Sequence, residues 1–175
     1  MKQVTSEKAT AGSKLSGTKG PTPCLTFKDH AEDAINFYVS LFPNSRIVSL
    51  VRSDGNGPIP KGQVLSASFQ LDGHDYTAFD GGPSFSFTEG FSLMVTCETQ
   101  EDIDETWDRL SEGGEPGPCG WLKDRFGVSW QVVPAELGKM LGNPAGGNTA
   151  GMMQALLKMG KLDIATLRRA YESGS

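Results

Sequence analysis

The sequence is poor in the side chains that usually hold metal ions or disulfides. Its 175 residues include only two histidines, His30 and His74, and three cysteines, at positions 24, 97 and 119. The cysteines are odd in number, widely spaced and without a Cys-x-x-Cys pair, which argues against a disulfide framework or a zinc knuckle. Free thiols of this kind suit a reducing compartment, so we expect a cytoplasmic protein.

Long apolar runs, basic stretches and familiar catalytic motifs are also missing. No segment approaches the roughly 20 apolar residues of a membrane span, and the N-terminus has no apolar signal-peptide core. The net charge is −5, of which residues 1–20 carry +3 and the remainder −8. Such an acidic body repels phosphate backbones, so we expect neither a nucleic-acid nor a membrane partner. There is no Gly-x-Ser-x-Gly, His-Glu-x-x-His or P-loop motif.

What the sequence does contain is an alternation of short β-rich segments with amphipathic helical ones. The patterns predict strands at residues 24–27, 45–52, 63–71, 74–80, 91–97, 115–124 and 127–134. They predict helices at residues 31–42, 100–111, 135–141, 149–159 and 163–171, the last capped by Asp163. Asp72-Gly73 predicts a tight hairpin.

The order β-α-β-β-β occurs twice, which indicates an internal repeat. A shift of 69 residues lays Tyr38 on Trp107, and a shift of 68 lays Leu25 on Leu93. We therefore expect three regions. They are a flexible tail at 1–20, paired βαβββ modules at 21–142 (about 21–86 and 87–134 plus a short helix), and a C-terminal helical extension at 143–175.

Alternation along the strands separates an apolar face from a face of small or polar side chains. Leu25 and Phe27 oppose Cys24 in the first strand, and Trp130 opposes Gln131 in the last. We expect the apolar faces to pack beneath the helices. The other faces would line a concave cleft; the alternative is a structural sheet that turns its polar face to water.

Four segments resemble a known family: CLTFKDHAEDAINFYVSLFPNSRI, FDGGPSFSFTEGFSLMV, GWLKDRFGVSWQVVP and MMQALLKMGKLDIATLRRAYES. They are similar to the vicinal oxygen chelate (glyoxalase/bleomycin resistance/dioxygenase) superfamily, and within it to the PhnB-like group, often labelled 3-demethylubiquinone-9 3-methyltransferase. The last two segments are the more specific for that group. The resemblance implies an α+β fold in which two βαβββ modules form a curved mixed sheet cleft, followed by C-terminal helices. It also implies a homodimer.

The resemblance does not supply a metal site. Metal-dependent members of the superfamily place His and acidic ligands at four strand positions, which fall here near Thr22 or Cys24, near Ser92, on Gln131 and at 78–80, where only Asp80 could coordinate. Hydroxyls and a neutral amide are poor ligands for Zn²⁺ or Fe²⁺. We therefore expect no metal and no cofactor, with a Cys24/Asp80/Gln131 site as the alternative.

A methyltransferase label meets a similar objection. The common S-adenosylmethionine site needs a parallel sheet and a glycine-rich turn between a strand and a helix. The glycine pairs at 81–82, 113–114 and 146–147 do not occupy such turns.

Three functions remain open. The first is a small-molecule-binding homodimer that sequesters or carries an apolar or aromatic ligand, for which the candidate binding residues are Cys24, Phe79, Ser92, Trp121 and Gln131. The second is an enzyme, by methyl transfer or by metal-assisted glyoxalase- or dioxygenase-type chemistry, with Asp80 as the candidate general base. The third is a scaffold that binds a partner through the methionine-rich C-terminal helices; ordinary packing is the alternative for those helices.

In the segment around Trp121, the alternation of side chains along a strand predicts one shared face for Cys119, Trp121 and Lys123. An aromatic ring beside a thiol and an amine would form one wall of a ligand pocket. The alternative is that Trp121 packs structurally and Lys123 pairs with a surface acid.

Overall fold

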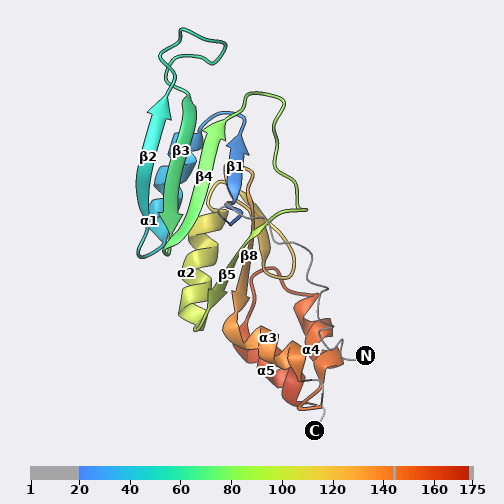
Figure 1. The fold of residues 1–175 in the computed structure, drawn as a ribbon. Coiled ribbons are helices and arrows are strands. Elements are labelled where there is room, and N and C mark those ends of the chain that lie inside the picture. The colour runs from blue at the N-terminus through green and yellow to red at the C-terminus, as the bar shows by residue number, and fades with distance from the viewer. Residues whose placement is uncertain (1–19, 144, 174–175) are drawn as a thin grey trace, which may run out of the picture.

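The computed structural model describes residues 20–143 and 145–173, so nearly all of the expected N-terminal tail lies outside the described residues. The strands are β1 (Cys24–Phe27), β2 (Arg46–Arg52), β3 (Val64–Leu71), β4 (His74–Asp80), β5 (Leu93–Cys97), β6 (Glu115–Pro116), β7 (Trp121–Lys123) and β8 (Ser129–Pro134). The helices are α1 (Ala31–Leu41), α2 (Gln100–Ser111), α3 (Ala135–Gly142), α4 (Thr149–Leu156) and α5 (Ile164–Glu172) (Figure 1). None of the described helices is both long and apolar enough to cross a membrane.

The strands form two four-stranded sheets with the same topology. Their orders are β1-β4-β3-β2 and β5-β8-β7-β6. In each sheet the first strand lies parallel to the last strand of its module, and the other neighbours are antiparallel. The predicted α+β fold with two βαβββ modules is confirmed.

The prediction of one strand over residues 115–124 was wrong. The segment forms two short antiparallel strands, β6 and β7, joined by a turn at 117–120. Pro116 and Pro118 interrupt a strand because proline has no N–H to donate to the ladder. Cys119 and Gly120 then take positive φ angles of 59° and 82°, which reverse the chain. This split gives the second module its third strand after the helix.

The predicted turns and caps agree better with the structure. Asp72 and Gly73 have φ angles of 45° and 76°, as the two central residues of a type I′ hairpin require. The Asp163 carboxylate accepts a hydrogen bond from the Thr166 N–H at 2.7 Å and so caps α5. α4 is shorter than predicted and ends at Leu156.

Strand alternation also places the core correctly. Leu25 and Phe27 of the first module, and Trp130 and Val132 of the second, are buried against the helices. The opposite faces of both sheets, which we call the open faces, are polar or mixed and point away from α1 and α2. Burial of the apolar side chains is the main driving force for this arrangement.

One buried aspartate joins the modules. Asp124, between β7 and β8, accepts hydrogen bonds from the Tyr38 hydroxyl of α1 at 2.7 Å and from the Trp130 indole at 2.8 Å. Its second oxygen accepts from the N–H groups of Phe126 and Val128. The first module's helix is thereby fixed to the second module's hairpin.

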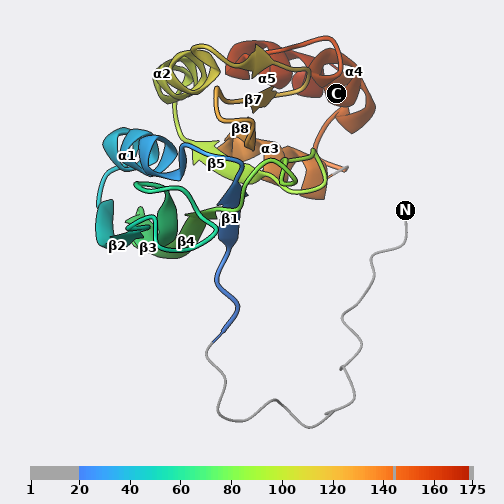
Figure 2. The ribbon, with the colours of Figure 1, turned by 90° about the horizontal axis from the view of Figure 1, so that it is seen from above.

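The C-terminal extension packs beside the second module, away from β2 and β3 (Figures 1 and 2). Together with Met140 of α3 it forms a second small core, whose other buried members are Met152, Leu156, Leu162 and Leu167. Its backbone also holds the turn at 117–120, because the N–H groups of Cys119 and Gly120 donate to the carbonyls of Met159 and Gly160 at 2.7 and 2.8 Å.

Candidate functional site

The open face of the second sheet brings chemically useful side chains into two rows. Met94, Gln131 and Trp121 are cross-strand neighbours in one row. Ser129, Lys123 and Glu115 form the next row. Side chains two residues apart in a strand share a face, so both rows point away from α2.

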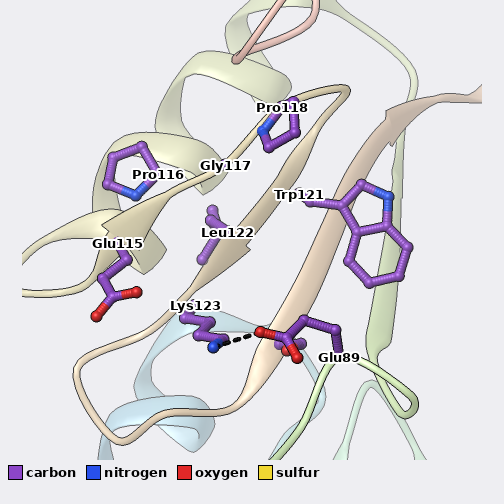
Figure 3. A pocket seen from close by; sticks show the side chains of 9 residues that line it. Glu89, Glu115, Pro116, Gly117, Pro118, Trp121, Leu122 and Lys123 are labelled. Atoms are coloured by element: carbon purple, nitrogen blue, oxygen red, sulfur yellow. Dashed lines mark ion pairs between the residues drawn. The ribbon is translucent and has the colours of Figure 1, made fainter. Parts of the chain in front are cut away.

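A cavity of about 440 Å³ opens beside these rows and is the candidate site. Its lining residues are Glu89, Glu115, Pro116, Gly117, Pro118, Trp121, Leu122, Lys123 and Ser129. In the view of Figure 3 the Trp121 ring lies to the right, Pro118 at the top and Lys123 with Glu89 at the bottom. Apolar walls therefore meet a charged end.

The charged end is an ion pair between Lys123 Nζ and Glu89 Oε1, 2.5 Å apart. This hydrogen bond, together with the charge of Glu89, raises the pKa of Lys123, and Glu115 adds a smaller contribution. The hydrogen bond from Lys123 likewise lowers the pKa of Glu89. Both groups are exposed to solvent at least in part, so the pair contributes little to stability, but both stay charged around neutral pH.

Ser129 is the least expected member of the site. It is 2% exposed although it lies on the open face, and its hydroxyl has no hydrogen-bond partner. Among the described residues only Thr149 Oγ1 shares this condition. A buried hydroxyl without a partner is uncommon in folded proteins and calls for an explanation.

The predicted binding residues of the second module lie on the open face, but only Trp121 lines this cavity. Gln131 donates a hydrogen bond from Nε2 to Ser92 Oγ at 2.8 Å, so the two side chains satisfy each other. Cys119, which we placed on the same face as Trp121, instead lies in the 117–120 turn and packs against the core of the extension.

The predicted binding residues of the first module lie elsewhere. Cys24 is exposed and lines a separate cavity of about 280 Å³ with Thr26, Phe85 and Phe91. Phe79, beside Thr26 in the sheet, meets the edge of the Phe85 ring at a centroid distance of 6.5 Å. Within one chain the five predicted residues are therefore not gathered in a single hollow.

Asp80 has a structural position rather than the one expected of a general base. It is 4% exposed, and its two oxygens accept hydrogen bonds from the N–H groups of Ala31 and Val64 at 2.9 and 2.7 Å. These bonds fix the start of α1 and the start of β3 to the end of β4. A base must reach a substrate proton, and neither oxygen is free to do so.

The residues do not fit the metal site of metal-dependent superfamily members. Among the described residues, no three His, Cys, Asp or Glu side chains lie close enough to hold one ion. Asp80 is occupied by backbone amides and Gln131 by Ser92, which leaves no set that includes Cys24. Within the described residues of one chain, the alternative Cys24/Asp80/Gln131 set is therefore not brought together.

The common S-adenosylmethionine site does not fit either. The two described turns that lead from a sheet strand into α1 or α2 are Lys28-Asp29-His30 and Glu98-Thr99, and neither contains glycine. Each sheet has only one parallel pair of strands. A phosphate- or nucleotide-type cradle at a helix N-terminus needs close backbone approach, which these turns do not provide.

Ser129 and Glu89 were not among the predicted binding residues. Ser129 has the same strand parity as Gln131, so alternation was a sufficient signal to place it on the open face. Glu89 lies in the loop between β4 and β5, and no pattern in the sequence connects it with Lys123. Trp121 and Lys123 both line the cavity, and Lys123 also pairs with the acid Glu89, whereas Cys119 does not line the cavity.

Comparison with known proteins shows the family of the chain. The family model for 3-demethylubiquinone-9 3-methyltransferase matches residues 19–133, so the C-terminal segment that we took as specific to the group lies outside the matched range. The PhnB protein from Bacillus cereus is 41% identical, with 67% of this chain and 100% of that chain covered at a TM-score of 0.61.

Two more distant structures share the fold. They are protein PA1353 from Pseudomonas aeruginosa (20% identity, 67% and 98% of the two chains covered, TM-score 0.56) and the fosfomycin resistance protein FosX from Mesorhizobium loti (14%, 74% and 99%, 0.51). None of the curated proteins compared with the chain matches it. By the extent of the family match and the identity to the Bacillus protein, the chain belongs to the PhnB-like 3-demethylubiquinone-9 3-methyltransferase family.

Proposed function

We propose that this protein binds a small molecule on the open face of its second module and carries or sequesters it. The observation that supports this most is the cavity of about 440 Å³ that joins the Trp121 ring and two prolines to a charged end. Its size falls in the range of ligand pockets, about 300–1,000 Å³, and such pockets combine apolar walls with a few polar groups. An apolar or aromatic ligand fits these walls.

The positions of the candidate catalytic groups support binding better than catalysis. Lys123 and Glu89 neutralise each other, and Asp80 is held by backbone amides. Neither the metal-assisted nor the methyl-transfer alternative has residues that fit its cofactor. The three cysteines form no disulfide, which supports a cytoplasmic location.

We further propose a homodimer. β5 pairs with β8 on one side only, so its other edge presents unpaired N–H and C=O groups. Phe91 and Met94 are exposed beside this edge. A second copy would cover these apolar side chains and bring open faces of two chains together.

The binding proposal is tested with 2-naphthol, an uncharged aromatic alcohol, and the full chain. Replacing Trp121 with alanine removes most of the apolar wall, so we expect affinity to fall at least about tenfold. NMR titration measures the affinity for 2-naphthol. Leu157→Ala, which truncates an exposed apolar side chain of the extension outside this cavity, serves as the control and should leave affinity unchanged. Absence of binding to the wild-type chain, or equal affinity in W121A, contradicts the proposal.

A further inference from the structure

The strongest unexplained feature of the cavity is the Ser129 hydroxyl. Ser129 lines the cavity, lies on the open face directly opposite Lys123 in the sheet, and has a buried Oγ without any partner. Leaving a buried hydroxyl unpaired is unfavourable, since water would satisfy it in the unfolded chain. A group on the ligand that both donates and accepts a hydrogen bond would remove this penalty on binding.

The charges around the cavity restrict that group further. Two carboxylates, Glu89 and Glu115, line it together with a single ammonium group, Lys123. The ammonium is already paired with Glu89. An anionic ligand would therefore meet net negative charge with no free cation, and like charges at short range are repelled.

We propose that the cavity selects uncharged aromatic ligands that carry a hydroxyl group, and that Ser129 binds this hydroxyl while Trp121 contacts the ring. This inference rests on the proposed function and adds the ligand class and the residue that sets it. Ser129 acts here as a specificity residue: a site with a buried hydrogen-bonding group rejects a ligand that lacks the matching group, because that group then stays unpaired.

The test compares three probes of equal ring size: 2-naphthol, 2-methylnaphthalene and 2-naphthoate. The wild-type chain should bind the alcohol about fivefold more tightly than the methyl compound, the value of one neutral hydrogen bond. It should bind the carboxylate at least about tenfold more weakly than the alcohol. Ser129→Ala should reduce the alcohol-to-methyl ratio to about one while affinity for the methyl compound stays the same or rises.

Ser92→Ala is the matched control. It removes a hydroxyl from the same open face, but one that already accepts a bond from Gln131 and does not line the cavity. The ratio should be unchanged in this variant. Thermal unfolding of each variant confirms that it is folded.

The outcomes separate the two proposals. One outcome overturns the role of Ser129 but keeps the binding site. In it the probes bind, W121A weakens their binding, and S129A keeps the wild-type ratio of affinities for the alcohol and the methyl compound. Stronger binding of the carboxylate than of the alcohol would overturn the ligand class. If none of the three probes binds, or W121A has no effect on them, the proposed function fails as well.

Discussion

The Asp124 side chain connects the two modules through hydrogen bonds. Four hydrogen bonds converge on its two oxygens, and one of them comes from the other module through Tyr38. Carboxylates that accept several hydrogen bonds inside a protein are strong acceptors, and removing the carboxylate would leave all of its donors unsatisfied. The junction therefore depends on the negative charge and shape of this carboxylate.

Replacing Asp124 with asparagine should lower the free energy of unfolding by about 2–4 kcal/mol, because its NH₂ group would face donors. Tyr38→Phe removes one hydrogen bond and should cost less, about 1–2 kcal/mol. Urea unfolding measures both losses in the free energy of unfolding, and the m-value should stay unchanged. A D124N protein as stable as the wild type contradicts this role.

Tyr38 adds a pH signature to that comparison. Burial, followed by the charge of Asp124, raises the pKa of Tyr38 well above its usual value of 10.0. The unfolded chain therefore releases the Tyr38 proton at a lower pH than the folded chain does. The contribution of Tyr38 to the free energy of unfolding is complete below about pH 10 and falls as the pH rises further. Y38F should lack this component of the alkaline loss.

At the scale of the elements, the extension supports the cavity. The turn at 117–120 carries Pro118 and leads into Trp121, and two hydrogen bonds attach it to the backbone of Met159 and Gly160. Gly120 packs so closely on Leu162 and on the Val132 carbonyl that a Cβ there would lie 2.7 Å from the carbonyl oxygen. Gln100 of α2 adds bonds to the backbone of Leu162 and Ile164.

Leu162→Ala should therefore destabilise the protein by about 2–4 kcal/mol and also weaken binding of 2-naphthol, since the wall loses its support. Leu162 is fully buried, whereas Leu157 in the same extension is 65% exposed. Leu157→Ala is the matched control and should change stability by less than about 0.5 kcal/mol. Thermal and urea unfolding measure the first effect and NMR titration the second. Unchanged affinity in folded L162A would show that the extension does not support the site.

Elements were predictable where local chemistry and periodicity agree. α2 has the predicted bounds because Thr99 and Asp102 form a capping box before an amphipathic run. The strand predicted over residues 115–124 was wrong because two prolines and a positive-φ cysteine outweigh the β-rich composition around them. The burial of Ser129 and the backbone hydrogen bonds of Asp80 depend on contacts between distant segments, which alternation alone does not provide.

At the scale of the whole molecule, the proposed dimer would form along the open edge of β5. Met94 lies on the open face and is 63% exposed. Its position next to Gln131 in the sheet puts it close to the candidate site. A dimer formed along this edge would place one copy's apolar side chains near the other's site.

We expect sedimentation to give a mass of about 37 kDa, twice the 18.7 kDa of one chain. Met94→Asp should raise the dimer dissociation constant at least about tenfold, because a charge would be buried without a partner. Leu157→Asp, equally exposed but in the extension, should leave the mass unchanged. A wild-type mass of one chain contradicts the dimer.

The bonds between the 117–120 turn and the extension have an evolutionary consequence. They connect one wall of the cavity to a part of the chain that the family model leaves out. A relative that keeps both sheets but differs beyond residue 133 would need other contacts to hold the 117–120 turn in place. Substitutions in the C-terminal extension alone would then change which ligands the cavity binds, while the two sheets stayed the same.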